Sequence, residues 1–261
     1  MKEKKLLSYF RRLYQKRFIM RCAIFVISAL LLIFAPRQFD IMHGFHVFDR
    51  PSFFHLMWIV WMVDMVMQLI PAKRYWPTGS QKFLKRTFQP LKDYMQRSDE
   101  KFIRFIIKSN RDTILIGLVW LVLNGAIGAL YFTGIIGRRM LLLISVAFYV
   151  CDLICVLFWC PFRVWFMKNR CCTTCRIFNW DHIMMFTPLL FVPGVYTWSL
   201  CAMALIIFII WEVTFQLHPE RFWEGTNRAL HCSNCTDRIC GERNCAAEFP
   251  DIRKDEPGNN K

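Results

Sequence analysis

Two neighbouring stretches decide the fold of this chain: TILIGLVWLVLNGAIGALYFTGII at 113–136 and MLLLISVAFYVCDLICVLFWCP at 140–161. An α-helix rises about 1.5 Å per residue, so about 20 apolar residues cross the hydrocarbon core of a membrane. Each stretch therefore predicts one membrane-spanning helix.

Three further apolar stretches lie at residues 22–36, 53–71 and 183–216. None of the five stretches contains a lysine or arginine, although the 261-residue chain has 34 of them. A cation inside a bilayer costs several kcal/mol, so this partition favours real membrane spans over the core of a soluble protein. The sequence predicts an all-α, multi-pass transmembrane helical bundle of five spans, or six under the alternative given below.

The composition agrees with a membrane protein. The chain is 55% apolar and 20% charged, whereas soluble domains are about 45–50% apolar and about 25% charged. Its 25 Phe and 10 Trp exclude intrinsic disorder. We find no glycine-rich phosphate loop, nucleophile elbow or HExxH motif, which disfavours a hydrolase or a nucleotide-driven machine. The composition leaves open whether the protein is an enzyme.

The charges of the connecting segments predict the orientation. Basic residues alternate between many and few along the chain: eight in 1–21, two in 37–52, eleven in 72–112, two in 134–139 and four in 162–182. Cytoplasmic segments carry the excess of Lys and Arg. The pattern predicts a protein of the cell membrane with a cytoplasmic N-terminus.

The stretch 183–216 is too long for one crossing and is interrupted by Pro188, Pro193 and Gly194. We expect a half-length segment at 183–193 and a true span at 195–216, which gives five crossings and a tail outside. A tight hairpin at Pro193 and Gly194 is the alternative, and it returns the tail to the cytoplasm. The tail carries seven basic and eight acidic residues, so its charge does not decide between them.

The loop 72–112 contains a basic stripe. Lys101, Arg104 and Lys108 alternate with Phe and Ile, which predicts a helix lying in the lipid headgroup layer. The lipid bilayer is therefore the expected partner; nucleic acid is not, because topology explains the basic excess. The predicted segments are a basic cytoplasmic start at 1–21, two spans in 22–71, the basic loop 72–112, two spans in 113–161, a cysteine-rich loop at 162–182, the interrupted stretch 183–216 and a cysteine-rich tail at 217–261.

Polar residues occur inside the predicted spans. Asp64, Asn124 and Asp152 fall near the centres of three of them, and Glu212 lies near the end of the last. Isolated polar groups in hydrocarbon are costly, so the three central residues are expected to meet. They could form a proton site, or hydrogen-bond a quinone or another buried ligand. The alternative is a structural clamp that joins three helices.

The first cysteine group is Cys160, Cys171, Cys172 and Cys175. A C-x-x-C turn brings two sulfurs to one side, where they can chelate a metal ion, and Cys followed by Pro also occurs in ferredoxin-like runs. Two alternatives remain: a redox-active pair whose thiolate is favoured by neighbouring arginines, and unligated structural thiols. The cysteines inside the spans are interpreted as small apolar residues: Cys22, Cys151, Cys155 and Cys201.

The second group is Cys232, Cys235, Cys240 and Cys245, with the pattern C-x2-C-x4-C-x4-C. Over these 14 residues the spacing resembles the retroviral-type zinc knuckle, with Cys240 in the place of its histidine. The resemblance implies tetrahedral Zn²⁺, and four thiolates could equally hold an iron–sulfur cluster. A tail outside the cell would instead form two disulfides.

Three functions are compatible with these features. The first is membrane electron transfer through cysteine-ligated iron–sulfur centres, with Asp64 and Asp152 handling protons. The alternative is a non-enzymatic scaffold or assembly protein whose zinc-folded tail binds a protein partner at the cytoplasmic face. The third is a small transporter that uses the intramembrane acids; with so few spans it would need to form a homo-oligomer.

Overall fold

The computed structural model describes residues 9–42, 44, 52–70, 77–91, 99–169, 171–231, 234 and 239. The predicted cysteines of the tail, Cys232, Cys235, Cys240 and Cys245, lie outside them. The helices are α2 (Tyr9–Phe34), α3 (Phe53–Leu69), α4 (Asp99–Phe132), α5 (Arg138–Leu157), α6 (Asp181–Phe186) and α7 (Val195–Leu217). Shorter helical turns are η1 (Pro36–Met42), η2 (Lys85–Thr87), η3 (Phe162–Met167), η4 (Cys172–Thr174), η5 (Thr187–Phe191), η6 (Pro219–Arg221) and η7 (Arg228–Leu230).

The helical class and its membrane character are confirmed. Among the described residues there is no β-strand, only two isolated bridges. In the part of the chain that the structure describes, four helices are long and apolar enough to cross a membrane: α2, α4, α5 and α7. The apolar helix α3 is shorter, with 17 residues. The coarse prediction of a multi-pass bundle therefore holds, whereas five or six complete crossings stay a prediction.

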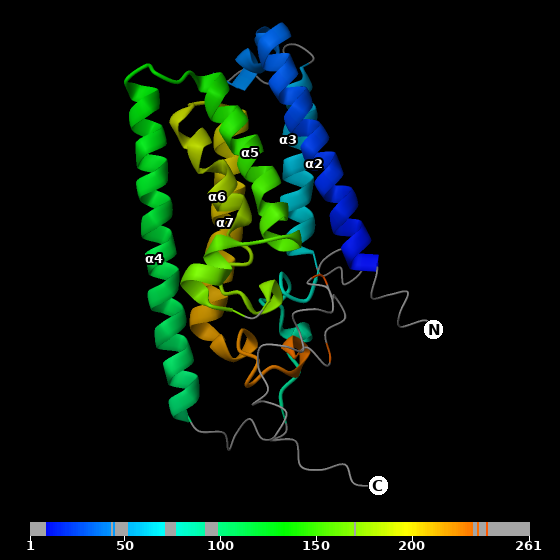
Figure 1. Cartoon of the computed structure of the whole chain (residues 1–261), viewed down its shortest axis with the longest axis vertical. Helices are drawn as coiled ribbons and strands as arrows, with labels where there is room; N and C mark the ends of the chain where they lie inside the picture. Colours follow the sequence, from blue (N-terminus) through cyan, green and yellow to red (C-terminus); the bar gives the residue numbers. More distant parts are fainter. Residues whose placement is uncertain are drawn as a thin grey trace.

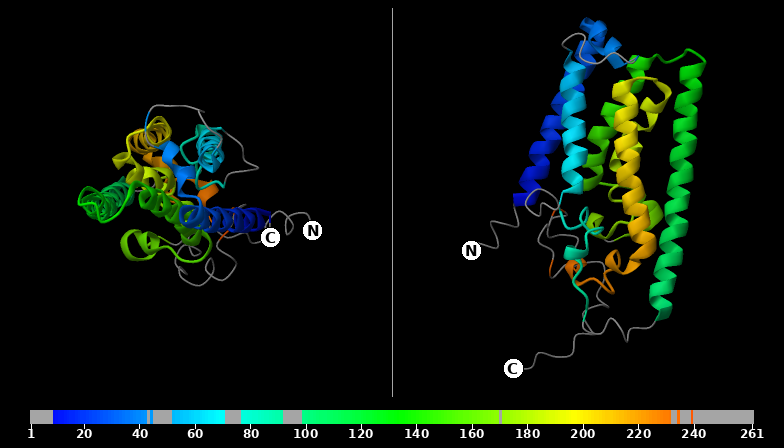
Figure 2. Two further views of the ribbon diagram at one scale, coloured as in Figure 1. Left: turned by 90° about the horizontal axis from the view of Figure 1, so that it is seen from above. Right: turned by 180° about the vertical axis from the view of Figure 1, so that it is seen from behind.

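Figures 1 and 2 show the arrangement of the helices. Helices α2, α3, α5 and α7 run side by side, and α4 stands at one side of the bundle. The start of α2 and the ends of α3, α5 and α7 point to the same end of the molecule. Most of the connecting chain gathers at this end, which we call the loop end.

The interrupted stretch contains a half-length segment, as predicted. Together α6 and η5 cover only residues 181–191, because Pro188 stands near the start of η5. The chain then reverses next to Gly44, whose carbonyl oxygen accepts a hydrogen bond from the Val195 amide at 3.2 Å. Helix α7 returns to the loop end, where Ile239 of the tail packs near Phe10 of α2. The start of α2 and the end of α7 thus lie at the same end of the molecule, and the side of the membrane that the tail occupies stays a prediction.

This reversal gives a test of the fold. A Cβ atom on Gly194 would lie 2.0 Å from the backbone carbonyl oxygen of Met42, so Gly194→Ala forces the two segments apart. We expect a loss of about 1–3 kcal/mol in the free energy of unfolding, the usual range for overpacking. Gly137→Ala is the matched control, since nothing lies within 4 Å of its added Cβ. Thermal unfolding in detergent compares the two, and equal midpoints would contradict this packing.

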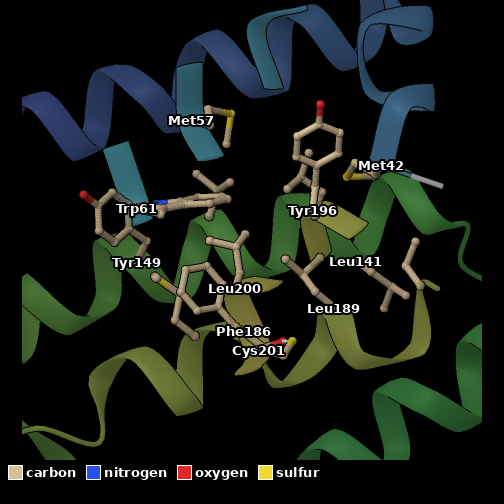
Figure 3. Close-up of a cluster of buried hydrophobic side chains, with 14 of the residues drawn as sticks. Met42, Met57, Trp61, Leu141, Tyr149, Phe186, Leu189, Tyr196, Leu200 and Cys201 are labelled. Carbon is tan, nitrogen blue, oxygen red and sulfur yellow. Dashed lines mark hydrogen bonds between the residues drawn. The ribbon is translucent and has the colours of Figure 1, made fainter. Parts of the chain in front are cut away.

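The main core lies between α3, α5, α6 and α7. Trp61 of α3 meets Tyr149 of α5 and Phe186 of α6 edge to face, with ring centroids 5.9 and 5.2 Å apart. Figure 3 shows these rings together with Leu200 of α7. These large buried side chains hold the polar residues described below at fixed positions.

The basic stripe does not form a helix of its own. Lys101, Arg104 and Lys108 belong to α4, which runs without interruption for 34 residues. Two phenylalanines of this part, Phe102 and Phe105, stack on Trp223 with ring centroids 5.5 and 5.7 Å away. Part of the apolar face thus packs against the chain that follows α7, whereas Ile103 and Ile107 are exposed, and contact with lipid headgroups stays a prediction.

Candidate functional site

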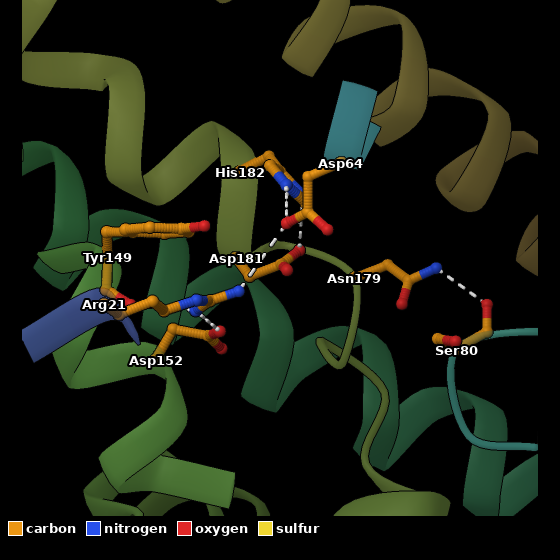
Figure 4. Close-up of polar contacts among 8 residues, drawn as sticks. All are labelled: Arg21, Asp64, Ser80, Tyr149, Asp152, Asn179, Asp181 and His182. Carbon is orange, nitrogen blue, oxygen red and sulfur yellow. Dashed lines mark hydrogen bonds and ion pairs between the residues drawn. The ribbon is translucent and has the colours of Figure 1, made fainter. Parts of the chain in front are cut away.

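Five ionisable side chains from four segments form a buried cluster toward the loop end. We call Arg21, Asp64, Asp152, Asp181 and His182 the charge cluster (Figure 4). Arg21 Nη1 donates to Asp152 Oδ2 at 2.6 Å, and Arg21 Nη2 lies 3.6 Å from Asp64 Oδ2. The ring of His182 completes the cluster, with Nε2 3.5 Å from Asp64 Oδ2 and Nδ1 3.2 Å from Asp181 Oδ1.

Arg21 is the centre of the cluster. Its side chain is almost fully buried, and Nη1 also donates to the Tyr149 carbonyl oxygen at 2.8 Å. The guanidinium carbon lies 3.8 Å from the centroid of the Tyr149 ring, which adds a cation–π contact. With so many partners, a guanidinium can stay charged away from water.

The predicted meeting of Asp64 and Asp152 is indirect, because Arg21 lies between them. Asp64 is the twelfth of the 17 residues of α3, and Asp152 is the fifteenth of the 20 residues of α5, so both lie on the loop-end side of their helix centres. Asn124 stays apart: its amide donates to the Trp120 carbonyl of the same helix, α4, at 3.0 Å. Arg21 stands at the middle of α2, so the cluster extends from the middle of the helices toward the loop end.

Cavities lie on both sides of the cluster. The lateral cavity, about 280 Å³, is lined by α2, α3 and Tyr149, and it includes Arg21 and Asp64. The second cavity, about 130 Å³, includes Asp152 and Asp181. Its walls come from α4, α5, α6 and the chain between α5 and α6.

Thiols surround the second cavity, which we call the thiol pocket. Five of the eight described cysteines line it: Cys151, Cys155, Cys160, Cys172 and Cys175. Arg163 also lines the pocket, and the rest of the wall is apolar: Trp120, Phe148, Val156, Phe162, Ile177, Phe178, Met184 and Met185. The pocket thus combines sulfur, two carboxylates and an apolar lining.

Two of these thiols influence each other's ionisation. Side-chain hydrogen bonding with Cys155 lowers the pKa of Cys160 to about 7 against the opposing effect of burial. The Arg163 amide adds a bond to the same sulfur at 3.4 Å. Cys172 is next to the pair, since its thiol donates to the Cys155 carbonyl at 3.8 Å. Burial raises the pKa of Cys175 to about 11, so Cys160 ionises more readily than Cys175 near neutral pH.

The predicted metal centre gains no support from this arrangement. Within the described ranges, no group of three or more Cys, His, Asp or Glu side chains is placed to hold one metal ion. Of the first cysteine group, Cys160, Cys172 and Cys175 line the pocket, whereas Cys171 faces the Thr174 hydroxyl at 4.0 Å. Three of these sulfurs thus share one pocket without forming such a group, and a metal held by this loop stays a prediction.

Two buried cations support the pocket from the loop end. Lys82 is fully buried, and its Nζ donates to the Cys175 carbonyl at 2.9 Å. Arg176 is paired with Glu212 through both carboxylate oxygens, and Trp180 Nε1 donates to the same carboxylate at 2.8 Å. The predicted polar residue Glu212 thus binds Arg176, which directly follows Cys175 in the chain.

The buried Lys82 predicts a pH dependence of stability. Burial lowers its pKa to about 7 in the folded protein, whereas an unfolded lysine keeps a pKa of about 10.4. Between these values the unfolded chain binds the additional proton, so the free energy of unfolding should rise with pH in this window. Lys82→Met should flatten that rise, measured by unfolding in detergent at several pH values. The exposed Lys85 provides the control Lys85→Met; the same rise in Lys82→Met as in the wild type would contradict the assignment.

Some of the site residues escaped the interpretation of the sequence. Arg21 was counted with the basic cytoplasmic start, and Cys151 and Cys155 as apolar fillers. A signal was present for the thiols, because Cys151 and Cys155 are four residues apart and share one helix face. No comparable signal marks Arg21, since only the packing of α2 against α5 brings it to Asp152.

Within the described residues, four helices are of membrane-spanning length and apolarity, and they define the class: a helical protein of the multi-pass membrane type, with a thiol-lined pocket. No family model, curated protein or solved structure matches the chain.

Proposed function

We propose that the protein is a membrane redox protein that stores two electrons in the thiols of Cys155 and Cys160. The observation that carries this proposal is that both thiols line the same pocket, where Cys155 lowers the pKa of Cys160. The remaining pocket thiols support it, because they stand where a third sulfur could exchange with a disulfide. This is the redox hypothesis of the sequence with a dithiol in place of a metal cluster.

Oxidation of such a pair to a disulfide requires an acceptor that takes up two electrons and two protons. Cys155 and Cys160 form one disulfide bond, and both thiol protons and two electrons leave. A thiolate is the reactive form, so the hydrogen bond from Cys155 to Cys160 favours the ionised Cys160. Asp152 and Asp181 line the same pocket and are suited to take up the protons.

Oxidation with diamide tests the proposal, since this azo compound takes up the two electrons and two protons itself. We expect a disulfide between Cys155 and Cys160 to form first, and mass spectrometry of non-reduced peptides identifies it. Cys201 is the control thiol: it is buried on α7 and donates to the Phe186 carbonyl, so Cys201→Ser should leave the reaction unchanged. The proposal fails if Cys155 and Cys160 stay reduced while other thiols oxidise.

The proposal also predicts a pH profile. Alkylation of Cys160 by iodoacetamide should rise with a midpoint near its pKa of about 7. Cys155→Ala removes the hydrogen bond that lowers this pKa, so the midpoint should move to higher pH. Peptide mass spectrometry after timed alkylation gives both profiles, and identical midpoints would contradict the contact between the thiols.

A further inference from the structure

We infer that the thiol pocket binds the ring of a membrane-soluble quinone, which accepts the electrons of Cys155 and Cys160. This inference rests on the proposed function and names the oxidant. Its structural basis is the size, lining and position of the pocket.

The pocket has the size of one six-membered ring. Its volume is about 130 Å³, and an apolar cavity of about 150 Å³ is known to accept benzene. Trp120 of α4 and Phe148 of α5 form one wall, with ring centroids 4.9 Å apart. Aromatic and methionine walls suit a flat, polarisable ring.

The pocket is accessible from the side of the bundle that would face lipid. Cys151 lines the pocket and is also exposed on α5, so the cavity reaches the surface there. Helix α4 has its principal contacts with η3 and η5 rather than with α5. A quinone with an apolar tail could therefore place its ring in the pocket and leave its tail in the bilayer.

The charges of the pocket fit the reaction. The two thiols become a disulfide, and the quinone becomes a hydroquinone by taking both electrons and two protons. Asp152 and Asp181 lie at the pocket, and Arg21 and His182 connect them to Asp64 at the lateral cavity. The lateral cavity contains no cysteine. A quinone that oxidises the thiols directly must therefore place its ring in the thiol pocket and not in the lateral cavity.

The test uses duroquinone, whose ring is fully substituted and cannot be alkylated by a thiolate. Reduced protein in lipid nanodiscs should form one hydroquinone per disulfide between Cys155 and Cys160, followed by absorbance and mass spectrometry. Cys151→Phe places a ring at the mouth of the pocket and should slow this reaction at least tenfold. Ile154→Phe is the matched control, because Ile154 is exposed on α5 but does not line the pocket; it should react like the wild type.

Diamide separates the failure of this inference from that of the proposed function. If diamide forms the disulfide and duroquinone does not, the quinone inference is wrong and the dithiol proposal stands. If Cys151→Phe reacts with duroquinone as fast as the wild type, the ring does not bind in the thiol pocket. If neither oxidant links Cys155 to Cys160, both proposals are wrong.

Discussion

Replacing Arg21 with methionine should lower the free energy of unfolding by about 3–5 kcal/mol, the range for breaking one partner out of a buried ion pair. Arg21 is 5% exposed and neutralises two carboxylates, Asp152 at 2.6 Å and Asp64 at 3.6 Å. Without it, His182 is the remaining cation of the charge cluster. Unfolding in detergent, followed by tryptophan fluorescence, measures the loss.

Two variants show whether this loss comes from charge pairing. Arg11→Met removes an exposed arginine of the same helix and should have little effect. The double variant Arg21→Met with Asp152→Asn removes both charges of the closest pair, so it should recover a large part of the stability. A double variant no more stable than Arg21→Met would show that the pair is not the cause.

Glu212→Ala removes the acidic partner of a buried ion pair and should also lower the free energy of unfolding by about 3–5 kcal/mol. It leaves the guanidinium of Arg176, which is 2% exposed, without its bidentate carboxylate. The Phe215 ring, 3.6 Å from the guanidinium carbon, cannot replace that partner because a cation–π contact is weaker than a charged hydrogen bond. Trp180 also loses the acceptor of its Nε1–H.

The exposed pair Glu100 and Arg104 provides the control. These side chains are 70% and 75% exposed and lie four residues apart on α4, so Glu100→Ala should change stability little. Replacing both Arg176 and Glu212 with apolar residues should be better tolerated than Glu212→Ala alone. Equal losses for Glu100→Ala and Glu212→Ala would mean that burial of Arg176 does not depend on this pair.

Apolar length and the absence of Lys and Arg were sufficient to find the membrane helices. The predicted span 140–161 corresponds to α5 (Arg138–Leu157), and 195–216 to α7 (Val195–Leu217). The half-length segment was also visible, since Pro188 and Gly194 interrupt the last stretch. These features are local: each depends on hydropathy, helix rise and proline within one segment.

The pairing of polar groups could not be predicted in the same way. Asp64 and Asp152 were expected to meet directly, but Arg21 of α2 lies between them. The apolar residues beside Lys101 were expected in the headgroup layer, and the structure shows that two of them, Phe102 and Phe105, stack on Trp223. In both cases a partner far along the chain decides the environment, and hydropathy within one segment does not contain that partner.

The amino-acid order alone specified a helical membrane protein with grouped cysteines and acids, because burial in lipid selects residues one segment at a time. Only the folded bundle decided that Arg21 joins the acids and that Cys155 meets Cys160 beside a ring-sized pocket. The physical reason is that ion pairs, thiol contacts and cavities arise between segments, through the packing of α2, α4, α5 and the loop end against one another.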